Sequence, residues 1–348
     1  MKVIWILDDI NTLNGMVQVV IGLSNHFSEK GHNVRIYSVF SGKTMPFFHL
    51  SPAVLVEHLG RTWDKTTRMD RHRLLGTIME KSDADIMLTC NEWANTSSVL
   101  QKRKFRGKLI LTQHLSCDNF SIRRKLMNGI LHRFADAVAV LTEADKEFYA
   151  GFGIHNVTVI PNAIYICPCG GEKLNVLCSV GRVEAVKGFD MLIAAYSQIA
   201  KDFPDWKLRI WGDGSQRETL LAKIEELGLS DQIEMPGVTD QVAEELSKSS
   251  VFVMSSRWEG FPLALIEAMS SENAIVAFDL PCTKDILSPA TGLVVPKNDV
   301  DALAGAMRKM LSDELLRVQC GAGARDAARK FNIDNVGHMW LDLFEQLK

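Results

Sequence analysis

The sequence lacks several features that would place it in common protein classes. No uninterrupted apolar run approaches the roughly 20 residues that a membrane-spanning helix needs, so the chain is not expected to cross a membrane. The net charge is only −3, from 39 basic and 42 acidic side chains, which argues against a generally basic nucleic-acid binder. Neither half has a Gly-x-Gly-x-x-Gly turn after a strand with an acid about 20 residues later, which argues against a nicotinamide-dependent enzyme.

Cysteine is scarce and irregularly spaced. The seven cysteines form no Cys-x-x-Cys pair, and the nearest two, Cys167 and Cys169, flank a proline. A zinc site or a disulfide framework would need closer and more regular spacing. The short apolar run at the N-terminus ends in Asp8 and Asp9, which is typical of a first β-strand rather than a signal peptide. We therefore expect reduced, mostly buried thiols in a cytoplasmic protein.

The chain does contain a regular alternation of short β-rich runs with longer helical patterns, which is typical of a parallel α/β fold. In the first half we predict a helix at 16–30 and strands at 3–7, 34–40, 86–90, 109–112, 137–141 and 157–160. The series then restarts with strands at 175–180, 207–211, 233–235, 251–254 and 274–278, and helices at 189–201, 216–227, 240–248 and 262–270. The segment 165–173 has the composition of a linker. The pattern predicts two Rossmann-like, doubly wound domains that face each other across a cleft, with ligands beyond the carboxyl ends of the strands.

Charge is divided unequally between the halves. Residues 1–165 carry 20 basic and 15 acidic side chains, whereas residues 166–348 carry 19 and 27. Part of the basic excess lies in the stretch 120–134, where arginines and a lysine alternate with large apolar residues. A basic amphipathic helix of this kind can lie on an anionic membrane surface. An ordinary helix with a solvated basic face explains the pattern equally well.

The densest chemical signal is the segment 255–269, Ser-Ser-Arg-Trp-Glu-Gly-Phe-Pro-Leu-Ala-Leu-Ile-Glu-Ala-Met. It directly follows the buried strand 251–254, and Pro262 suits the first position of a helix, where its missing N–H costs nothing. Glu259 then lies in the loop at the carboxyl end of the strand, and Glu267 lies in the following helix. Amides at a helix start bind phosphate, and carboxylates accept paired sugar hydroxyls. For Glu267 alone, a solvated glutamate would be the default interpretation.

A second polar loop, Ser-Val-Gly-Arg-Val-Glu-Ala-Val-Lys-Gly-Phe over 179–189, joins the first strand of the second series to its helix. Gly181 permits a tight turn, and Arg182 and Lys187 can converge on one diphosphate. In a glycosyl transfer such cations stabilise the charge that develops on the leaving nucleotide diphosphate. The alternative is a pair of ordinary surface cations.

Weaker signals lie in the first half. Gly15 opens a helix after the first strand, and His114, in Thr-Gln-His, can hydrogen-bond a sugar hydroxyl, although a lone histidine is more often structural. The one Asp-x-Asp pair, Asp83 and Asp85, precedes a strand and so lies at its amino end. A metal-holding pair should lie at the carboxyl end, so we predict no metal site there.

Together these segments resemble the retaining nucleotide-sugar glycosyltransferases of family 4, which have the GT-B fold. The resemblance rests on Gly-Arg-x₄-Lys-Gly, on Gly-Asp-Gly at 212–214 and on Glu-x₇-Glu, and it extends over nearly the whole chain, through Pro161-Asn162 and the segment 291–296. It implies an enzyme of bacterial surface-polysaccharide synthesis. It also implies an acceptor-side domain at 1–165, a donor-binding domain at 166–334, and a final helix at 335–348 that packs back on the first domain.

The resemblance also implies a role for each matching residue. Arg182 and Lys187 would bind the donor diphosphate, Glu267 the ribose hydroxyls and Glu259 the transferred sugar. The other positions assigned are Gly15 near the phosphate, His114 on the 6-hydroxyl side of the sugar, Val238 in the base-binding turn, and Gly260, Phe261 and Leu263 beside Glu259. Of these, Glu259, His114, Arg182 and Lys187 form the expected catalytic set.

The chain departs from the family pattern in two places. Asn14-Gly15-Met16-Val17 stands where the family usually has Gly-Gly-Met/Ala-Glu, so one glycine and the following acid are missing. Leu280-Pro281-Cys282 stands where relatives often have a Gly-Gly turn. The first departure leaves open a non-catalytic, glycosyltransferase-like partner subunit.

No well-placed protein nucleophile is apparent, so the family resemblance favours front-face substitution with retention. In that reaction a donor phosphate oxygen takes the acceptor proton; covalent double displacement stays open. Because Arg182 and Lys187 would do the work of a metal, we expect no metal and no cofactor besides the nucleotide-sugar co-substrate. The Phe-Pro-Leu after Gly260 favours a UDP-hexose or UDP-N-acetylhexosamine donor over GDP-mannose.

The expected acceptor is a saccharide or lipid-linked saccharide of cell-surface polysaccharide or lipopolysaccharide synthesis. If the stretch 120–134 touches a membrane, the protein would be cytoplasmic and peripheral on the inner face of the plasma membrane. No nucleic-acid partner is expected.

Overall fold

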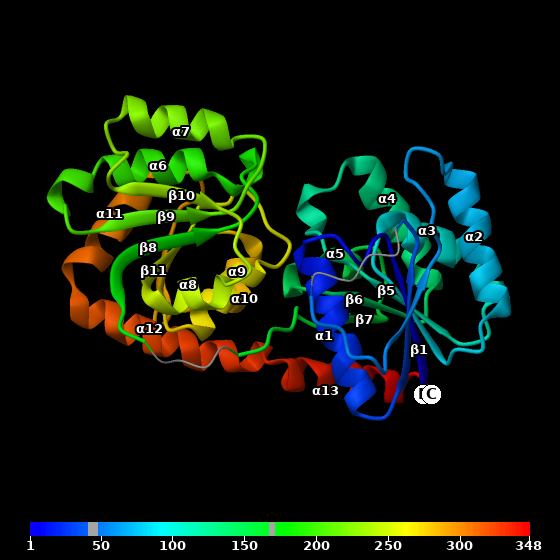
Figure 1. The fold of residues 1–348 in the computed structure, drawn as a ribbon. Helices are drawn as coiled ribbons and strands as arrows, with labels where there is room; N and C mark the ends of the chain where they lie inside the picture. Colours follow the sequence, from blue (N-terminus) through cyan, green and yellow to red (C-terminus); the bar gives the residue numbers. More distant parts are fainter. Residues whose placement is uncertain (41–47, 167–170) are drawn as a thin grey trace. The chain divides into compact units, whose positions relative to one another are not determined.

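The computed structural model describes residues 1–40, 48–166 and 171–348. It divides into two compact units (Figure 1). The first unit comprises Met1–Tyr165 and Phe331–Lys348, and the second comprises Ile166–Lys330. Cys167 and Cys169 of the predicted linker lie outside the described residues. The five described cysteines, at 90, 117, 178, 282 and 320, are buried, as the sequence predicts.

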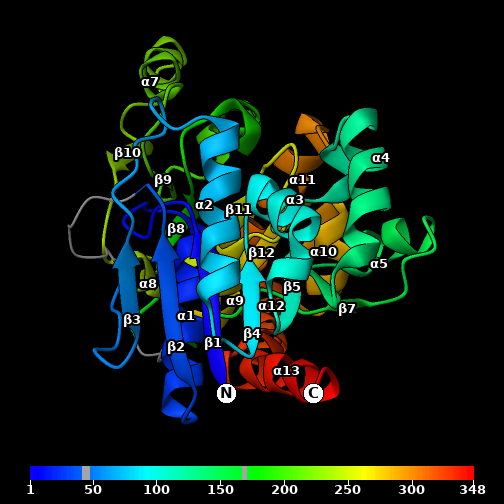
Figure 2. The same ribbon diagram turned by 90° about the vertical axis from the view of Figure 1, so that its right-hand side faces the viewer.

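The first unit contains a seven-stranded sheet of order β3-β2-β1-β4-β5-β6-β7. Its strands are β1 (Lys2–Leu7), β2 (Asn33–Ser38), β3 (Leu55–His58), β4 (Ile86–Thr89), β5 (Lys108–Thr112), β6 (Ala137–Val140) and β7 (Val157–Val159). All neighbouring strands pair in parallel, and Figure 2 shows β3, β2, β1 and β4 in this order. The central strands are buried along almost their whole length, which explains why they are continuous apolar runs in the sequence.

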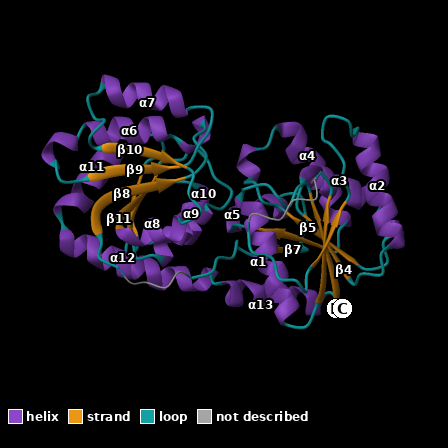
Figure 3. Ribbon diagram, viewed as in Figure 1, coloured by secondary structure: helices purple, strands orange, loops and turns teal. Residues whose placement is uncertain are grey.

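Helices cover both faces of this sheet (Figure 3). They are α1 (Gly15–Glu29), α2 (Arg68–Lys81), α3 (Glu92–Leu100), α4 (Ile122–Leu131), α5 (Glu143–Ala150) and α13 (Ile333–Gln346), with short 3₁₀ turns η1 (Lys102–Lys104), η2 (Cys117–Asn119) and η3 (His132–Phe134). Side chains of α2, α3 and α5 pack in the hydrophobic core on one face. On the other face, Trp340 of α13 packs edge-on against Trp5, with 6.1 Å between ring centroids, and Phe344 packs against Phe27 of α1 at 5.3 Å.

The chain re-enters the first unit through a short backbone pairing. The amide of Ile164 donates to the carbonyl of Phe331 at 2.9 Å, and the amide of Ile333 donates to the carbonyl of Ile164 at 2.8 Å. The chain therefore returns to the first unit at Phe331, slightly before residue 335, where the resemblance placed the start of the returning helix.

The second unit contains a six-stranded parallel sheet of order β10-β9-β8-β11-β12-β13. Its strands are β8 (Leu174–Val180), β9 (Lys207–Trp211), β10 (Ile233–Gly237), β11 (Ser249–Met254), β12 (Ala274–Phe278) and β13 (Gly292–Val295). The helices are α6 (Phe189–Ser197), α7 (Arg217–Glu226), α8 (Val242–Lys248), α9 (Leu263–Ser270), α10 (Pro281–Ile286), α11 (Val300–Ser312) and α12 (Glu314–Ala328), with 3₁₀ turns η4 (Ala185–Lys187), η5 (Ala200–Asp202) and η6 (Arg329–Phe331). The prediction of two Rossmann-like, doubly wound domains is confirmed.

Most element boundaries agree with the sequence prediction within a few residues, and the differences have local causes. Strands β3 and β13 were not predicted, because each has only four residues and neither is fully buried. The helix predicted at 189–201 ends at Ser197 and is followed by η5. Ile199 and Ala200, at the start of η5, are buried and so prolong the apolar pattern. No helix within the described ranges is long and apolar enough to span a bilayer.

Candidate functional site

The two polar loops singled out in the second half of the sequence follow adjacent strands. Strands β8 and β11 pair in parallel, so the loop at 181–188 after β8 and the loop at 255–262 after β11 leave the same edge of the sheet. The strand order reverses at this pair, because β8 is followed in sequence by β9 on one side and β11 by β12 on the other. Such a switch point is where open α/β sheets bind ligands.

An ion pair joins the two loops. Nζ of Lys187 lies 2.7 Å from Oε1 of Glu259, and both side chains are largely buried, with 22% and 14% exposed. The hydroxyl of Ser256 donates to the same Glu259 oxygen at 2.7 Å. The hydroxyl of Ser255 donates to the backbone carbonyl of Lys187 at 3.0 Å. The structure therefore brings together a cation and a carboxylate that the resemblance assigned to different parts of one donor.

Gly188 lies where the two loops pack too tightly for a side chain. Its backbone is left-handed, with φ of 65°, and a Cβ placed there would lie 2.1 Å from the carbonyl oxygen of Ser255. Only glycine adopts this conformation easily and leaves this space. In the Lys-Gly pair of the motif, Lys187 thus provides the charge and Gly188 allows the close contact with Ser255 that positions it.

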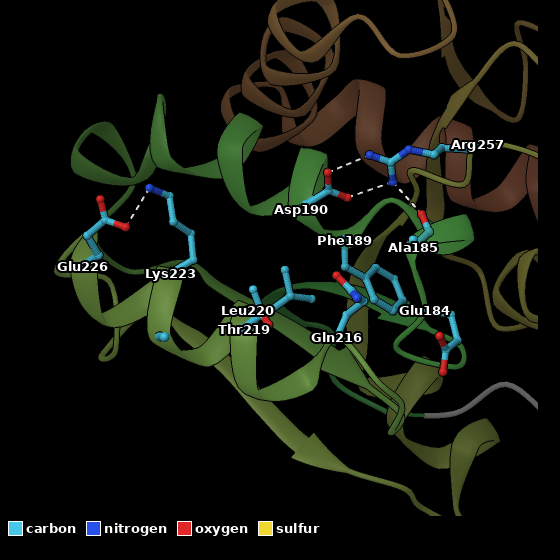
Figure 4. A pocket seen from close by; sticks show the side chains of 11 residues that line it. Glu184, Ala185, Phe189, Asp190, Gln216, Thr219, Leu220, Lys223, Glu226 and Arg257 are labelled. Carbon is cyan, nitrogen blue, oxygen red and sulfur yellow. Dashed lines mark hydrogen bonds and ion pairs between the residues drawn. The ribbon is translucent and has the colours of Figure 1, made fainter.

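Arg257 of the second loop also connects the two loops. Its amide donates to the carbonyl of Val186 at 2.8 Å, and its guanidinium donates to the carbonyl of Ala185 at 2.5 Å. The same guanidinium makes a bidentate pair with Asp190 in the first turn of α6, at 2.9 and 2.6 Å (Figure 4). We interpret Arg257 and Asp190 as positioning residues, which the sequence analysis did not identify. The Arg257 guanidinium holds the pKa of the Asp190 carboxyl below its usual value.

The Arg257–Asp190 pair also borders a pocket of about 460 Å³ on the helical side of the loops (Figure 4). Its other lining residues come from η4, α6 and α7 and include Glu184, Phe189, Leu220 and Lys223. None of the predicted donor residues lines this pocket. The pocket therefore lies beside the loops rather than at the ion pair.

We expect Arg257→Lys to lower turnover by about three- to tenfold, because one ammonium cannot replace the bidentate fork that ties both loops to α6. The pair is partly exposed, so the free energy of unfolding should fall by less than about 1 kcal/mol. The matched control is Arg308→Lys, which alters a similarly exposed pair with Asp202 away from these loops. Steady-state kinetics and thermal unfolding of both variants check this. Equal turnover of the Arg257→Lys and Arg308→Lys variants would contradict a positioning role for Arg257.

The helix after the second loop begins one residue later than predicted. Pro262 is the N-cap of α9, with φ of −79° and ψ of 100°, rather than its first helical residue, and it provides no side-chain cap. Gly260, Phe261 and Leu263 are buried around this helix start. Glu267 lies on the fifth residue of α9 and is partly buried. The backbone amides of the first turn are thus left without a side-chain cap, the arrangement that attracts anions.

The remaining donor positions lie on neighbouring loops of the same sheet edge. The Gly-Asp-Gly turn after β9 packs on the loop after β8, since the amide of Val183 donates to the carbonyl of Asp213 at 2.8 Å. Val238 follows β10 and is 59% exposed. Arg182 is exposed, and within the described part of the chain it has no ion-pair partner within 4 Å. The loops after β10, β9, β8 and β11 therefore lie in this order along one edge of the sheet.

Gly15 and His114 belong to the first unit. Gly15 is the first residue of α1, directly after the N-cap Asn14, whose side chain accepts from the amide of Val17 at 2.9 Å. The glycine turn predicted to open a helix is thus present.

The tautomer of His114 follows from its neighbour. The hydroxyl of Thr112 donates to the carbonyl of Thr89 at 3.0 Å, so its oxygen accepts from Nε2 of His114, 2.9 Å away. This assignment leaves Nδ1 of His114 as an acceptor, buried and without a partner among the described residues. The Nε1–H donor of Trp5 and the Oδ1 acceptor of Asn162 are also buried without a partner among the described residues, and all three residues line one small cavity. Burial lowers the pKa of His114 to about 4, which keeps the ring neutral at pH 7.

The His114 pKa predicts a pH dependence of stability. The pKa of an unfolded histidine is about 6.5, and that of folded His114 is about 4. The unfolded state therefore binds the proton first, so the free energy of unfolding falls as the pH falls from 6.5 towards 4. Urea unfolding across this range should show the loss, and His114→Gln should reduce it. Buried His132 contributes in the same direction and accounts for part of the remainder. An NMR titration of His114 with a midpoint near 6.5 would contradict the prediction.

The Asp-x-Asp pair lies at the amino end of β4, as predicted. Asp83 pairs with the side chain of Lys2, and Oδ2 of Asp85 accepts from the backbone amide of Lys2 at 2.7 Å. These two carboxylates therefore connect β1 to the turn before β4. Among the described residues, no group of three His, Cys, Asp or Glu side chains is arranged to hold a metal ion.

Two family models match this chain, and together they span most of it. The model described as "Glycosyltransferase Family 4" matches residues 13–166, and the model described as "Glycosyl transferases group 1" matches residues 171–327. The boundary between the two matches coincides with the boundary between the structural units.

Several curated proteins are similar over the full chain. An exopolysaccharide phosphotransferase of Streptomyces coelicolor is 28% identical over 100% of this chain, although the chain spans only 41% of that protein. The amylovoran biosynthesis glycosyltransferase of Erwinia amylovora is 25% identical, over 98% of this chain and 99% of its own. An α-1,4-N-acetyl-D-galactosaminyltransferase of Campylobacter jejuni, whose name includes a saccharide on PP-undecaprenol, is 25% identical over 100% and 99%.

Solved structures support the fold. Sucrose-phosphate synthase of Thermosynechococcus elongatus superposes with a TM-score of 0.85 at 19% identity, over 100% of this chain and 99% of its own. HepE of Anabaena, solved with UDP-glucose, gives 0.82 at 17% identity, over 99% and 100%. The predicted GT-B fold is confirmed.

Proposed function

We propose that this chain, which belongs to glycosyltransferase family 4, transfers a hexose or N-acetylhexosamine from a UDP-sugar to a saccharide or lipid-linked saccharide, with retention of configuration. The observation that carries the proposal is the Lys187–Glu259 pair at the β8/β11 switch point. It places a cation and a hydroxyl-binding carboxylate within one site.

The loops of the second unit would provide most of the donor contacts that the proposal needs. Exposed Arg182 and the Lys187 ammonium would bind the diphosphate, together with the uncapped amides at the start of α9. Glu259, already oriented by Ser256, would accept the sugar hydroxyls, and Glu267 those of the ribose. Val238 would border the base, and Gly260, Phe261 and Leu263 would shape the wall beside the sugar. UDP is favoured because HepE, which has the same fold, was solved with UDP-glucose.

In the proposed reaction the two cations stabilise the charge that grows on the leaving diphosphate, without a metal ion. A donor phosphate oxygen takes the acceptor proton on the front face of the sugar; double displacement is the alternative. His114 would lie on the 6-hydroxyl side of the sugar. Gly15 would let its loop approach the phosphate.

The acceptor is proposed from the relatives. The Erwinia protein is named for amylovoran biosynthesis and the Campylobacter protein for an undecaprenol-linked saccharide, so we propose a bacterial surface polysaccharide or lipopolysaccharide pathway. A GDP-mannose-type mannosyltransferase and a non-catalytic partner subunit are the alternatives.

One assay decides among them. Purified protein is incubated with UDP-glucose, UDP-N-acetylglucosamine, UDP-N-acetylgalactosamine or GDP-mannose, and nucleotide release is measured with and without EDTA. We expect UDP release that EDTA does not change. Release only from GDP-mannose would support the mannosyltransferase, and no release from any donor, with or without a membrane-extract acceptor, would support the partner subunit.

A helix of the first unit supports a membrane-associated site of action. On α4 and the following turn, Ile122, Leu126, Ile130 and Phe134 recur every fourth residue and are 79%, 51%, 55% and 60% exposed. Arg123 and Lys125 lie beside this stripe with no ion-pair partner within 4 Å among the described residues. Arg124 differs, because it pairs with Glu92 at 3.1 Å and stacks on Phe120. We propose that this face rests on the anionic inner surface of the plasma membrane.

We expect the native protein to bind liposomes that contain anionic lipid and not purely zwitterionic ones. Leu126→Ser with Ile130→Ser should abolish the binding, and Arg123→Gln with Lys125→Gln should weaken it about thirtyfold, since each of the two charges near the surface contributes about 1 kcal/mol. Arg124 is left unchanged because of its contacts within the fold. The charge-matched control is Lys201→Gln with Lys309→Gln in the second unit. Native protein that does not cosediment with anionic liposomes would refute the proposal.

A further inference from the structure

A group of aromatic and charged side chains at the sheet edge of the first unit has no role in the site described above. It consists of Asp8, Phe40, Trp63, Arg71 and Trp93, and we call it the Asp8 cluster. Its members come from the ends of β1 and β2, from the segment before α2, from α2 and from the start of α3. Residues distant in sequence therefore meet at this edge.

The Asp8 cluster lies at the switch point of the first sheet. The strand order reverses between β1 and β4, which pair in parallel. Asp8 follows β1 directly, and Trp93 lies in the first turn of the helix after β4. This position is the one from which an open α/β sheet binds a ligand, and it corresponds to the β8/β11 position in the second unit.

Asp8 is a carboxylate held partly out of water. Its Oδ1 accepts from Nε1 of Trp93 at 2.7 Å. Burial raises the pKa of Asp8, and the Trp93 hydrogen bond and the Arg71 charge oppose that rise. A partly buried carboxylate costs free energy unless polar partners satisfy it, and sugar hydroxyls are suitable partners.

Trp63 provides a partly exposed aromatic surface. Its side chain is 55% exposed, although Phe40 packs edge-on against it with 4.7 Å between ring centroids. The Arg71 guanidinium lies 4.3 Å from the Trp63 ring and 5.9 Å from that of Trp93. Nε of Arg71 is buried without a hydrogen-bond partner among the described residues. The cluster thus presents an aromatic surface beside a guanidinium whose Nε has no hydrogen-bond partner among the described residues.

The chain around Trp63 is positively charged. Residues 61–73 carry five arginines and lysines against two aspartates, and the positive end of α2 begins at Arg68. Within the described ranges, none of these five cations has an ion-pair partner within 4 Å. The field at this edge therefore favours a ligand that carries negative charge.

We propose that the Asp8 cluster binds a saccharide that carries a phosphate or a carboxylate. Asp8 accepts the ring hydroxyls, Trp63 stacks on the sugar ring, and Arg71 holds the anionic group. This inference rests on the proposed function, and it identifies the acceptor as an anionic saccharide. The aromatic rings of the cluster cannot by themselves distinguish an anionic sugar from a neutral one, so this selectivity depends on Arg71.

The test uses the full chain labelled with 5-fluorotryptophan, in a background of Arg182→Ala and Lys187→Ala that disables the proposed donor site. Fluorine NMR follows Trp63 and Trp93, which are assigned by Trp63→Phe and Trp93→Phe. The probes are glucose 6-phosphate, glucuronate, glucose and inorganic phosphate. We expect both anionic sugars to shift the two resonances more strongly than glucose or phosphate.

We expect Arg71→Gln to weaken binding of both anionic sugars about tenfold, Asp8→Asn to weaken all sugars, and the surface change Trp63→Ala to abolish stacking without unfolding. Arg35→Gln is the matched control, since its guanidinium lies 6.0 Å from the Tyr37 ring in the same unit. No shift with any sugar, equal binding of glucose, or phosphate binding as tightly as the sugars would overturn the inference. Nucleotide release by the chain with intact Arg182 and Lys187 tests the proposed function separately.

Discussion

Replacing Lys187 with alanine is expected to lower turnover about a hundredfold, the effect typical of removing one preorganised charge from a transition state. Two causes add. The ammonium would no longer stabilise the leaving diphosphate, and Glu259, which is only 14% exposed, would lose the cation 2.7 Å away. A carboxylate left partly buried without its partner is destabilised and reorients. Steady-state nucleotide release measures the effect.

The control for Lys187→Ala is Lys223→Ala in the same unit. Lys223 makes an exposed pair with Glu226, at 2.8 Å, and lines the pocket beside the loops rather than the ion pair. We expect less than a twofold change in this variant. Glu259→Gln alone and combined with Lys187→Ala separates the two causes, because the double variant carries no orphaned charge. Full activity of Lys187→Ala would refute both the site and the proposed role of its cation.

Gly188→Ala is expected to lower both the stability and the turnover of the protein. An alanine must adopt φ near 65° and place its Cβ 2.1 Å from the Ser255 carbonyl oxygen. The first cost is about 1 to 2 kcal/mol. The second cannot be relieved without moving the loop that carries Glu259 away from the loop that carries Lys187. Turnover should therefore fall by more than tenfold, together with the melting temperature.

Gly228→Ala provides an unusually close control for Gly188→Ala. Its φ is 67°, yet nothing lies within 4 Å of the added Cβ. It should show only the left-handed backbone cost, a destabilisation of about 1 to 2 kcal/mol, with turnover unchanged. Thermal unfolding and nucleotide release of the two variants isolate the cost of separating the loops. If both variants lost the same stability and kept the same activity, the close contact at Gly188 would have no functional meaning.

The fold was predictable because its signals are local. Buried parallel strands appear as short apolar runs, and glycine and proline mark where they end. β3 and β13 were missed since four half-buried residues carry too little pattern. The candidate site was predictable to the level of its two loops, because both carry charged residues directly after buried strands. Arg257 was visible in the same motif, but its partner Asp190 is 67 residues away in sequence, so nothing local indicated the pair.

The sequence by itself determined the α/β architecture, the two halves, and the residue types available for an anionic sugar donor. It did so through periodicity and through motifs contained within single loops. Only the tertiary structure decided which charges meet. It paired Lys187 with Glu259, tied both loops to α6 through Arg257, left the stripe on α4 exposed, and assembled the Asp8 cluster from five separate segments. The physical reason is that strand order, rather than chain order, decides which loops share a sheet edge, and that order depends on long-range pairing.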